Sequence, residues 1–329
     1  MKQSILKNYS IITISFLFIS FPVILSCQSH LSVRTISPGK TYLEKTGFKT
    51  GRFSRSYLIH VPSGYTPANQ YPLVVMLHGA FSTAGEMEEK TGLSTLADRE
   101  DFLVLYPNGI GIMGFLQHWN AGFCCGKAMA DDIDDVGFIT YAIDDVCQKL
   151  SVDRSRIYMS GYSNGAMMAC RYVSAHPEKI AAVAVLAGAI GGRSGPEVPF
   201  RRVKDVTGPM PAIIFHSSGD THIPLGGGQN PDKKSEREFL PLTELKDYWI
   251  RSNQCGGTVA REALFGGKVV REQWTDCMPG GNVTLLVIDG WPHIWPGRFF
   301  TDELEAGNAL KGFDAAEIMW DFLKDISKN

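Results

Sequence analysis

The chain carries almost no net charge. Its 32 Lys and Arg residues and 34 Asp and Glu residues leave a formal charge of −2 at pH 7. Without an excess of basic side chains, the protein has no overall positive electrostatic potential that would attract nucleic acid or acidic lipid. Internal repeats and low-complexity segments are also missing from the sequence. We therefore expect an ordinary globular protein that does not bind nucleic acid.

Metal-binding patterns are lacking as well. Neither a Cys-x-x-Cys pair nor a cluster of histidines accompanies the cysteines, which argues against zinc. The acidic segment 131–135 (DDIDD) lacks the alternating ligands and the glycine of an EF-hand loop. Asp134 and Asp135 fit the start of a helix instead, where carboxylates cap N–H groups and interact favourably with the dipole. No metal and no cofactor is expected.

The apolar run at the N-terminus is too short and too interrupted to span a membrane comfortably. It extends from Ile11 to Leu25 behind two lysines, which is the arrangement of an export signal. It ends in ILSC, which resembles the box of bacterial lipoproteins, where cleavage precedes a cysteine that then carries lipid. Residues 1–26 are therefore predicted to be a signal peptide and Cys27 to be lipidated. A plain secretory signal with an incidental cysteine is the alternative.

The residue after this cysteine bears on the location of the protein. Gln28, and not Asp, follows Cys27, which in such lipoproteins implies sorting to the outer membrane. Several acyl chains would hold the mature protein at a membrane without a transmembrane helix. We expect an exported outer-membrane lipoprotein, facing the periplasm or the surface, or otherwise a secreted protein. The polar residues 27–45 are predicted to form a tether.

Cysteines other than Cys27 are six in number, and an even count in an oxidising compartment predicts disulfides. Cys255 and Cys277 flank one strand-like segment and are the predicted local pair. Two adjacent cysteines cannot easily pair with each other. The remaining four are expected to bridge among themselves in a pairing that the sequence leaves open: Cys124, Cys125, Cys147 and Cys170.

Buried strand-like runs alternate with amphipathic helical segments from residue 57 onwards. The 329 residues are long for one domain, but α/β folds often reach this length. Alternation of this kind predicts a mostly parallel central sheet with helices on both faces. We expect strands within 57–62, 71–79, 102–108, 156–161, 180–190, 210–220, 268–274 and 283–290, and helices within 86–100, 134–151, 166–176, 242–253 and 314–327. Residues 46–329 are predicted to form this one α/β domain.

The segment GYSNG, residues 161–165, lies between a predicted strand and a predicted helix. This G-x-S-x-G pattern is typical of the nucleophile elbow of the α/β-hydrolase fold, in which glycines permit a crowded turn that exposes the serine. Ser163 is therefore the predicted nucleophile. Its neighbour Asn164 is predicted to donate its backbone N–H to an oxyanion, and the second N–H is assigned to Ala80, after the strand 71–79.

A serine at its ordinary pKa needs a base and an orienting acid, which follow it along the chain in this fold. Four of the eight histidines lie after Ser163, and His293, in the loop GWPHIWPG, is the one with no evident structural role. Asp220 ends a buried strand, where sites in open α/β sheets are built, and is the predicted acid. Asp289 is the second choice. His78 is expected to brace the loop before Ala80.

Six motifs extend this interpretation to the whole domain: YPLVVMLHG, WNAGFCCG, DDVGFI, VDRSRIYMSGYSNGAMMA, HSSGDTHIPLGGG and HIWPG. Together they resemble the secreted polyhydroxybutyrate depolymerase and feruloyl esterase group of α/β-hydrolases. The resemblance implies a Ser163–Asp220–His293 triad and a cleft lined by Trp119 and Asn120. The oxyanion loop HGAFSTAGE and Trp291 and Pro292 of the histidine loop depart from the group's usual sequences, which leaves the substrate open.

The expected function is hydrolysis of carbohydrate-linked feruloyl or acetyl esters through an acyl-enzyme. Aromatic side chains that could stack on such a ligand include Tyr162 and Trp295, besides Trp119. Hydrolysis of polyhydroxybutyrate-type oligomers is the alternative. A surface lipoprotein that only binds glycans, or a serine peptidase, is a further alternative. No protein partner is predicted.

Overall fold

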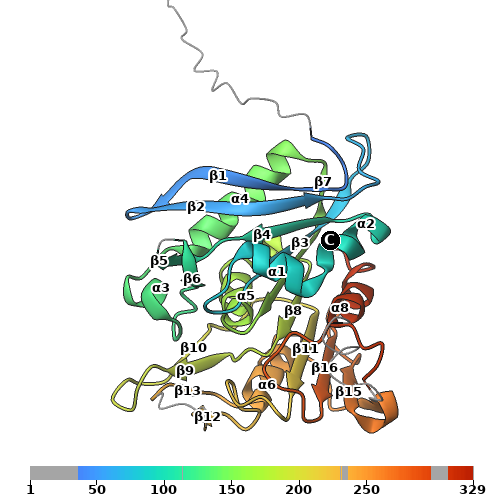
Figure 1. Cartoon of the computed structure of the whole chain (residues 1–329). Helices are drawn as coiled ribbons and strands as arrows, with labels where there is room; N and C mark the ends of the chain where they lie inside the picture. The colour runs from blue at the N-terminus through green and yellow to red at the C-terminus, as the bar shows by residue number, and fades with distance from the viewer. Residues whose placement is uncertain (1–35, 113, 230, 232–235, 298–309, 329) are drawn as a thin grey trace, which may run out of the picture. The chain divides into compact units, whose positions relative to one another are not determined.

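Ten strands form one sheet in the part of the chain that the computed structural model describes, residues 36–112, 114–229, 231, 236–297 and 310–328. Its order is β1-β2-β4-β3-β7-β8-β11-β16-β15-β14 (Figure 1). The strands from β4 to β16 are parallel, and an antiparallel pair flanks them at each edge. The mostly parallel sheet predicted from the sequence is therefore confirmed. The strands are β1 (Lys40–Thr50), β2 (Phe53–Val61), β3 (Tyr71–Leu77), β4 (Leu103–Pro107), β7 (Val152–Tyr162), β8 (Ala182–Leu186), β11 (Ala212–Ser217), β14 (Ala260–Leu264), β15 (Val269–Trp274) and β16 (Val283–Ile288).

Helices cover both faces of the sheet, and each face has its own core. Along β3, Leu73, Val75 and Leu77 pack in one core, whereas Val74 and Met76 pack in the other, as the two-residue period of a strand requires. The first core contains the buried faces of α4 (Asp135–Lys149), α5 (Asn164–Ala175) and α6 (Leu242–Ser252). The second contains those of α1 (Ala84–Thr91), α2 (Leu93–Glu100) and α8 (Ala315–Leu323).

Several short elements beside the main sheet were not predicted. A second sheet has the order β10-β9-β13-β12, and β5 pairs with β6 in a hairpin. Strands of two to four residues are too short to show a period in the sequence, which is why they were missed. These elements are β5 (Ile110–Ile112), β6 (Phe115–His118), α3 (Gly126–Ala130), β9 (Gly191–Arg193), β10 (Arg201–Arg202), β12 (Gly228–Gln229) and β13 (Glu238–Phe239), with the 3₁₀ turns Pro177–Lys179 and Phe265–Gly267.

Two predicted boundaries are wrong. Residues 40–45, assigned to a tether, form the first half of β1, which pairs with β2. Only one side of β1 is partly buried, so its sequence lacks a clear apolar run. The helix predicted over 86–100 is two helices, because Gly92 adopts φ 61° and ends the first one. The compact unit that contains the sheet begins at Ser37.

The predicted signal peptide, residues 1–26, and the predicted lipidation site Cys27 lie outside the described residues. Within those residues, none of the helices is both long and apolar enough to span a bilayer.

Candidate active site

Ser163 lies in the sharp turn between β7 and α5. Its backbone has φ 56° and ψ −120°, a conformation that residues with a side chain rarely adopt. Gly161 and Gly165 make this turn possible, because a Cβ on Gly161 would collide with the carbonyl of Gly165 and a Cβ on Gly165 with that of Leu77. The chain thus makes the elbow that its sequence predicts, with Ser163 on the wall of a cleft.

His293 links Ser163 to Asp220. Its Nε2 lies 2.9 Å from Ser163 Oγ, and its Nδ1 lies 2.7 Å from Asp220 Oδ2. The three residues follow β7, β11 and β16, whose carboxyl ends lie at the same edge of the parallel sheet. The three side chains that the sequence selected are therefore in hydrogen-bond contact. Asp289 is 3.2 Å from Lys268 Nζ instead.

Asp220 is held as an anion by its surroundings. Burial alone would raise the pKa of this carboxyl, but the hydrogen bond and charge of His293 and the N–H of Ile223 hold the pKa below its ordinary value. Oδ1 accepts the backbone N–H groups of His222 and Ile223, both at 2.9 Å. Oδ2 therefore faces the imidazole as an ionised acceptor, which favours the tautomer with a proton on Nδ1.

Buried tryptophans anchor the loop that carries His293. Trp291 and Trp295 pack in the core beside α8, and Trp291 Nε1 donates to the carbonyl of Ile294 at 2.9 Å. The hydroxyl of Tyr162, next to the nucleophile, donates to the carbonyl of His293 at 2.7 Å. Trp291 differs from the residue usual in the histidine loop of the group that the sequence resembles. In this structure it anchors the loop, and with it His293, to the core.

Asn164 and Ala80, the predicted oxyanion donors, line the same cleft as Ser163. Asn164 is the first residue of α5, where backbone N–H groups have no acceptor within the helix. The dipole of α5 also favours negative charge at this end. The arrangement suits a developing oxyanion at Ser163.

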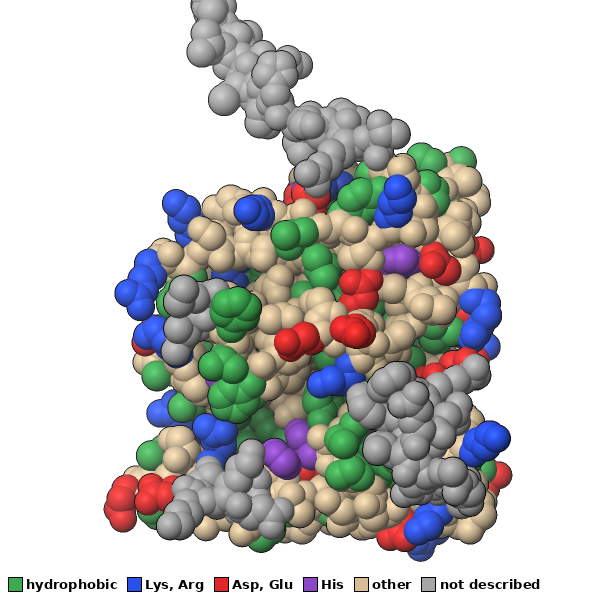
Figure 2. Space-filling model, in the orientation of Figure 1, with side chains coloured by type: hydrophobic (Ala, Val, Ile, Leu, Met, Phe, Trp, Pro, Cys, Tyr) green, Lys and Arg blue, Asp and Glu red, His purple; other side chains and the backbone are tan. Residues whose placement is uncertain are grey.

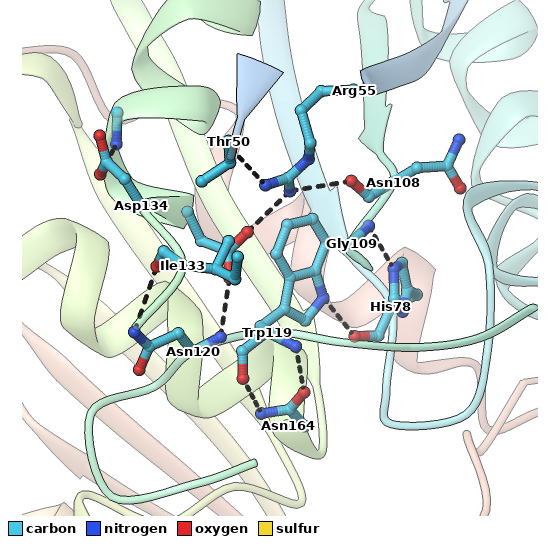
Figure 3. A network of polar contacts seen from close by, with 12 residues as sticks. Thr50, Arg55, His78, Asn108, Gly109, Trp119, Asn120, Ile133, Asp134 and Asn164 are labelled. Carbon is cyan, nitrogen blue, oxygen red and sulfur yellow. Dashed lines mark hydrogen bonds and ion pairs between the residues drawn. The ribbon is translucent and has the colours of Figure 1, made fainter. Parts of the chain in front are cut away.

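Trp119 connects the two sides of this region (Figure 3). Its backbone N–H donates to Asn164 Oδ1 at 2.8 Å, and Asn164 Nδ2 donates to its carbonyl at 3.1 Å. Its indole Nε1 donates to the carbonyl of His78, in the loop that leads to Ala80, at 2.9 Å. His78 is itself braced, since its Nε2 accepts the N–H of Gly109 at 2.9 Å. Trp119 therefore contacts both elements that carry the proposed oxyanion donors, Asn164 through its backbone and the loop before Ala80 through its indole.

A buried ion pair lies behind Trp119. Arg55 Nη2 is 2.7 Å from Asp135 Oδ1, and neither side chain is exposed. Asp135 Oδ2 accepts the backbone N–H of Asn120 at 2.8 Å. Asp134 caps α4, as predicted, but Asp135 turns into the core. The pair was missed because the two residues lie 80 positions apart and show no shared motif.

Three of the four predicted substrate contacts are wrong. Trp119, Asn120 and Trp295 are 0%, 2% and 1% exposed, and none of them lines the cleft. Their side chains are turned into the protein, where Trp119 Nε1 donates to the carbonyl of His78 and Asn120 Nδ2 donates to the carbonyl of Ile133 at 3.1 Å. Tyr162 does line the cleft. Large aromatic side chains near a motif are as suited to a core as to a ligand, and the sequence alone did not distinguish these roles.

The cleft above Ser163 has a volume of about 300 Å³. Figure 2 shows a hollow on this face, with histidine and apolar side chains at its edge. His222, which the sequence assigned no role, stacks on His293 with ring centroids 4.9 Å apart and an interplanar angle of 12°. Phe81, which belongs to the oxyanion loop and is 64% exposed, lies on the cleft wall. Among the described residues, no three His, Cys, Asp or Glu side chains are grouped closely enough to hold a metal ion.

The cysteine predictions are partly wrong. Cys255 and Cys277 form a disulfide, the local pair expected from the sequence. Cys124 and Cys125, expected not to pair, are joined to each other across a cis peptide bond with Cα atoms 3.1 Å apart. The two further cysteines do not pair with each other and are free thiols: Cys147 in α4 and Cys170 in α5. Burial raises the pKa of both thiols.

Comparison with known proteins relates this chain to esterases. The family described as Esterase PHB depolymerase matches residues 55–207, which include the elbow and the oxyanion loop. Feruloyl esterase B of Piromyces equi is 27% identical over 282 residues, or 83% of this chain and 45% of that protein. Poly(3-hydroxyalkanoate) depolymerase C of Paucimonas lemoignei is 30% identical over 178 residues, or 52% of this chain and 39% of that protein. The chain thus spans less than half the length of either relative.

A solved structure supports the same fold. The acetyl xylan esterase of Aspergillus awamori superposes with a TM-score of 0.57 at 16% identity, covering 80% of this chain and 97% of that one. This likeness concerns the fold, because the sequence identity is low. The family match over residues 55–207 and the two relatives make the chain similar to esterases of the PHB depolymerase family, and the solved structure shows the same fold.

Proposed function

We propose that the protein hydrolyses carboxylic esters with Ser163 as nucleophile, His293 as general base and acid, and Asp220 as the residue that orients His293. The observation that carries this proposal is the continuous hydrogen-bond path from Asp220 through His293 to Ser163 Oγ. The match of residues 55–207 to an esterase family supports it.

Acylation begins when Ser163 Oγ attacks the ester carbonyl carbon while His293 Nε2 takes the hydroxyl proton. Asp220 stabilises the imidazolium that forms. The carbonyl oxygen becomes an oxyanion, to which the N–H groups of Asn164 and Ala80 donate; donors of this kind are worth roughly 10² to 10³ in kcat. The intermediate then collapses, His293 gives its proton to the leaving alkoxide, and the acid remains bound to Ser163 as an ester.

Deacylation repeats these steps with water. His293 Nε2 takes a proton from a water molecule as its oxygen attacks the acyl carbonyl. The second oxyanion uses the same two N–H donors, and its collapse returns the proton from His293 to Ser163 Oγ. The products are the free acid and the regenerated enzyme.

Ser163→Ala tests this mechanism. With an aryl acetate as substrate, we expect kcat to fall by roughly 10⁴ or more, because the nucleophile is lost while the fold is kept. An unchanged melting temperature checks the fold. A fluorophosphonate should label the wild type and not the variant. Full hydrolysis by Ser163→Ala would refute the mechanism, and failure of the wild type to label would favour a protein that only binds glycans.

For the substrate we propose a carbohydrate-linked acyl ester, feruloyl or acetyl. The relative named feruloyl esterase B, which matches 83% of this chain, supports this choice. A cleft of about 300 Å³ with Phe81 and Tyr162 on its wall has room for a small flat acyl group. The second candidate is a hydroxyalkanoate oligomer, favoured by the family description and by the relative from Paucimonas lemoignei.

A panel of esters distinguishes these candidates. Methyl ferulate, acetylated xylan and hydroxybutyrate oligomers should be compared by kcat/KM on the purified protein. The proposal expects ferulate or acetate release to exceed hydroxybutyrate release by at least tenfold. The reverse order would identify the oligomers as the substrate.

We also propose that the protein is exported and lipidated at Cys27. The ILSC sequence before Gln28 and the disulfide between Cys255 and Cys277 support export. Metabolic labelling with palmitate in a bacterial host should mark the wild type and not Cys27→Ser. Labelling of both, or of neither, would contradict lipidation at this residue.

A further inference from the structure

Two cationic side chains lie on the wall of the cleft beside Ser163. Lys90 and Arg237 both line it, and among the described residues that line it none is Asp or Glu. Asp220, the nearest acid in the proposed mechanism, lies behind His293 with its side chain 1% exposed. The whole chain has a formal charge of −2, so the presence of two cations on this wall does not follow from a basic composition.

Lys90 is held at the cleft by an aromatic ring. It lies in the last turn of α1, and its Nζ is 5.5 Å from the centroid of the Tyr162 ring. That ring is fixed in turn by the hydrogen bond from its hydroxyl to the carbonyl of His293. A cation–π contact orients the ammonium group without neutralising it, and within the described residues no carboxylate forms an ion pair with Lys90.

Arg237 comes from a different part of the chain. It immediately precedes β13 of the small sheet, and it is half-buried. Burial lowers the pKa of its guanidinium, which means that its surroundings hold less water than the open surface. A guanidinium in such a place binds a carboxylate or a phosphate strongly, because its planar N–H groups match two oxygens at once.

We propose that Lys90 and Arg237 form an anion subsite beside Ser163, and that the substrate is an ester that carries a carboxylate close to its scissile bond. This inference rests on the proposed esterase function and specifies its substrate. A volume of about 300 Å³ is at the small end for ligand pockets, so the charge and the ester must belong to the same small molecule or sugar unit. The carboxylate can lie on the acid part, as in a hydroxyacid oligomer, or on the alcohol part, as in an acylated uronic acid.

Two pairs of esters test whether the carboxylate lies on the acid part or on the alcohol part. Within each pair, the two members differ only by methylation of the carboxylate. The first is 4-nitrophenyl hemiglutarate and its methyl ester, and the second is acetylated glucuronic acid and its methyl ester. We expect the wild type to show at least tenfold higher kcat/KM for the charged member of one pair at low salt. That preference should shrink as ionic strength rises, because screening weakens the attraction.

The ratio of kcat/KM for charged to neutral ester is then measured in Arg237→Gln and Lys90→Gln. Each variant should lower this ratio at least fivefold, and Arg237→Lys should retain part of it. Lys45→Gln, which removes an exposed charge from β1, is the matched control and should leave the ratio unchanged.

The anion subsite is refuted if the wild type treats the members of both pairs alike, or prefers the methyl esters. It is also refuted if Arg237→Gln and Lys90→Gln slow both members of a pair equally, because the cations would then act on the chemistry or the fold. Either result leaves the esterase mechanism standing, since the neutral esters are still cleaved. Failure of that mechanism shows instead as cleavage of the neutral esters by Ser163→Ala.

Discussion

His78 and His293 share a residue type and differ in what their ring nitrogens contact. His293 lies between Asp220 and Ser163, so one nitrogen meets an anion and the other meets a hydroxyl at the cleft. His78 is fully buried, and its Nε2 accepts the backbone N–H of Gly109. Burial lowers the pKa of His78 to about 4. A histidine that stays neutral and accepts one N–H is suited to bracing a loop, whereas the contacts of His293 fit the proton transfer that we propose for it.

This buried histidine predicts a pH dependence of stability. In the unfolded chain His78 takes a proton below pH ~6.5, but in the folded protein it stays neutral down to about 4. The unfolded state therefore binds more protons between these values, and the free energy of unfolding falls as the pH falls through this window. The full effect is about 3 kcal/mol. Urea unfolding of the wild type at several pH values measures it.

His78→Gln is the matched variant, because a glutamine oxygen can still accept the N–H of Gly109 and does not titrate. Its free energy of unfolding should change less steeply with pH between about 6.5 and 4, because unfolding of the variant takes up about one proton fewer in this range. An identical slope in the two proteins would mean that His78 does not contribute.

At the scale of the elements, the segment between β6 and α3 forms hydrogen bonds both to α5 and to the loop after β3. Trp119, in this segment, holds Asn164 at the start of α5 through its backbone and the loop after β3 through its indole. The two proposed oxyanion donors come from those two elements. Their relative position therefore depends on a residue that does not touch the cleft.

Trp119→Phe removes the indole N–H and keeps an aromatic ring. We expect kcat to fall about tenfold to a hundredfold while KM stays within about twofold, because an oxyanion forms only in the transition state. Affinity for a phenylboronic acid, whose adduct with Ser163 resembles the tetrahedral intermediate, should fall in parallel with kcat. A rise in KM with unchanged kcat would contradict this positioning role.

Trp249→Phe controls for the loss of a buried indole. Trp249 is fully buried in α6, and its Nε1 has no hydrogen-bond partner among the described residues. This variant should destabilise the protein by a comparable amount but leave kcat close to the wild-type value. Equal losses of kcat in the two variants would point to packing alone.

The turn between β7 and α5 leads to a prediction about stability. Gly165→Ala would drive a Cβ into the carbonyl of Leu77, a backbone group that cannot move aside, and should cost roughly 2–4 kcal/mol. Gly85→Ala, on the exposed side of α1, meets only Leu58 at 4.0 Å and should stabilise the helix by roughly 0.5–1 kcal/mol. Urea unfolding of both variants checks the opposite signs. An equal change in the free energy of unfolding of the two variants would mean that the backbone around residue 165 shifts to accommodate the added Cβ.

The sequence predicted those elements that have a long or strongly apolar pattern. β3 and β11 are buried on both faces and have continuous apolar sequences. Ser163, Asp220 and His293 could be selected because each of them follows a strand that was predicted in this way. The short strands around Arg237 have no such pattern, so neither the small sheet nor the cations of the cleft could be predicted. The burial of single side chains could not be predicted either. Trp119, for example, is buried by contacts with His78 and Asn164, which lie 41 and 45 positions away in the sequence.

At the scale of the whole molecule, the two disulfides differ in how much chain they constrain. The bond between Cys255 and Cys277 joins residues 22 positions apart, between the end of α6 and the segment after β15. The bond between Cys124 and Cys125 joins neighbours and closes no loop. In the loop-entropy account, only the first can restrict the unfolded chain appreciably.

The double variant Cys255→Ala/Cys277→Ala should therefore lose about 3 kcal/mol of unfolding free energy, the value that loop closure gives for a separation of this size. Dithiothreitol should reduce the stability of the wild type by a similar amount, because it opens the same loop. The double variant should respond to dithiothreitol by less than about 1 kcal/mol, since its other disulfide closes no loop. A large response in the double variant would assign the stabilisation to Cys124 and Cys125, and would show that local packing rather than chain entropy decides what a disulfide contributes here.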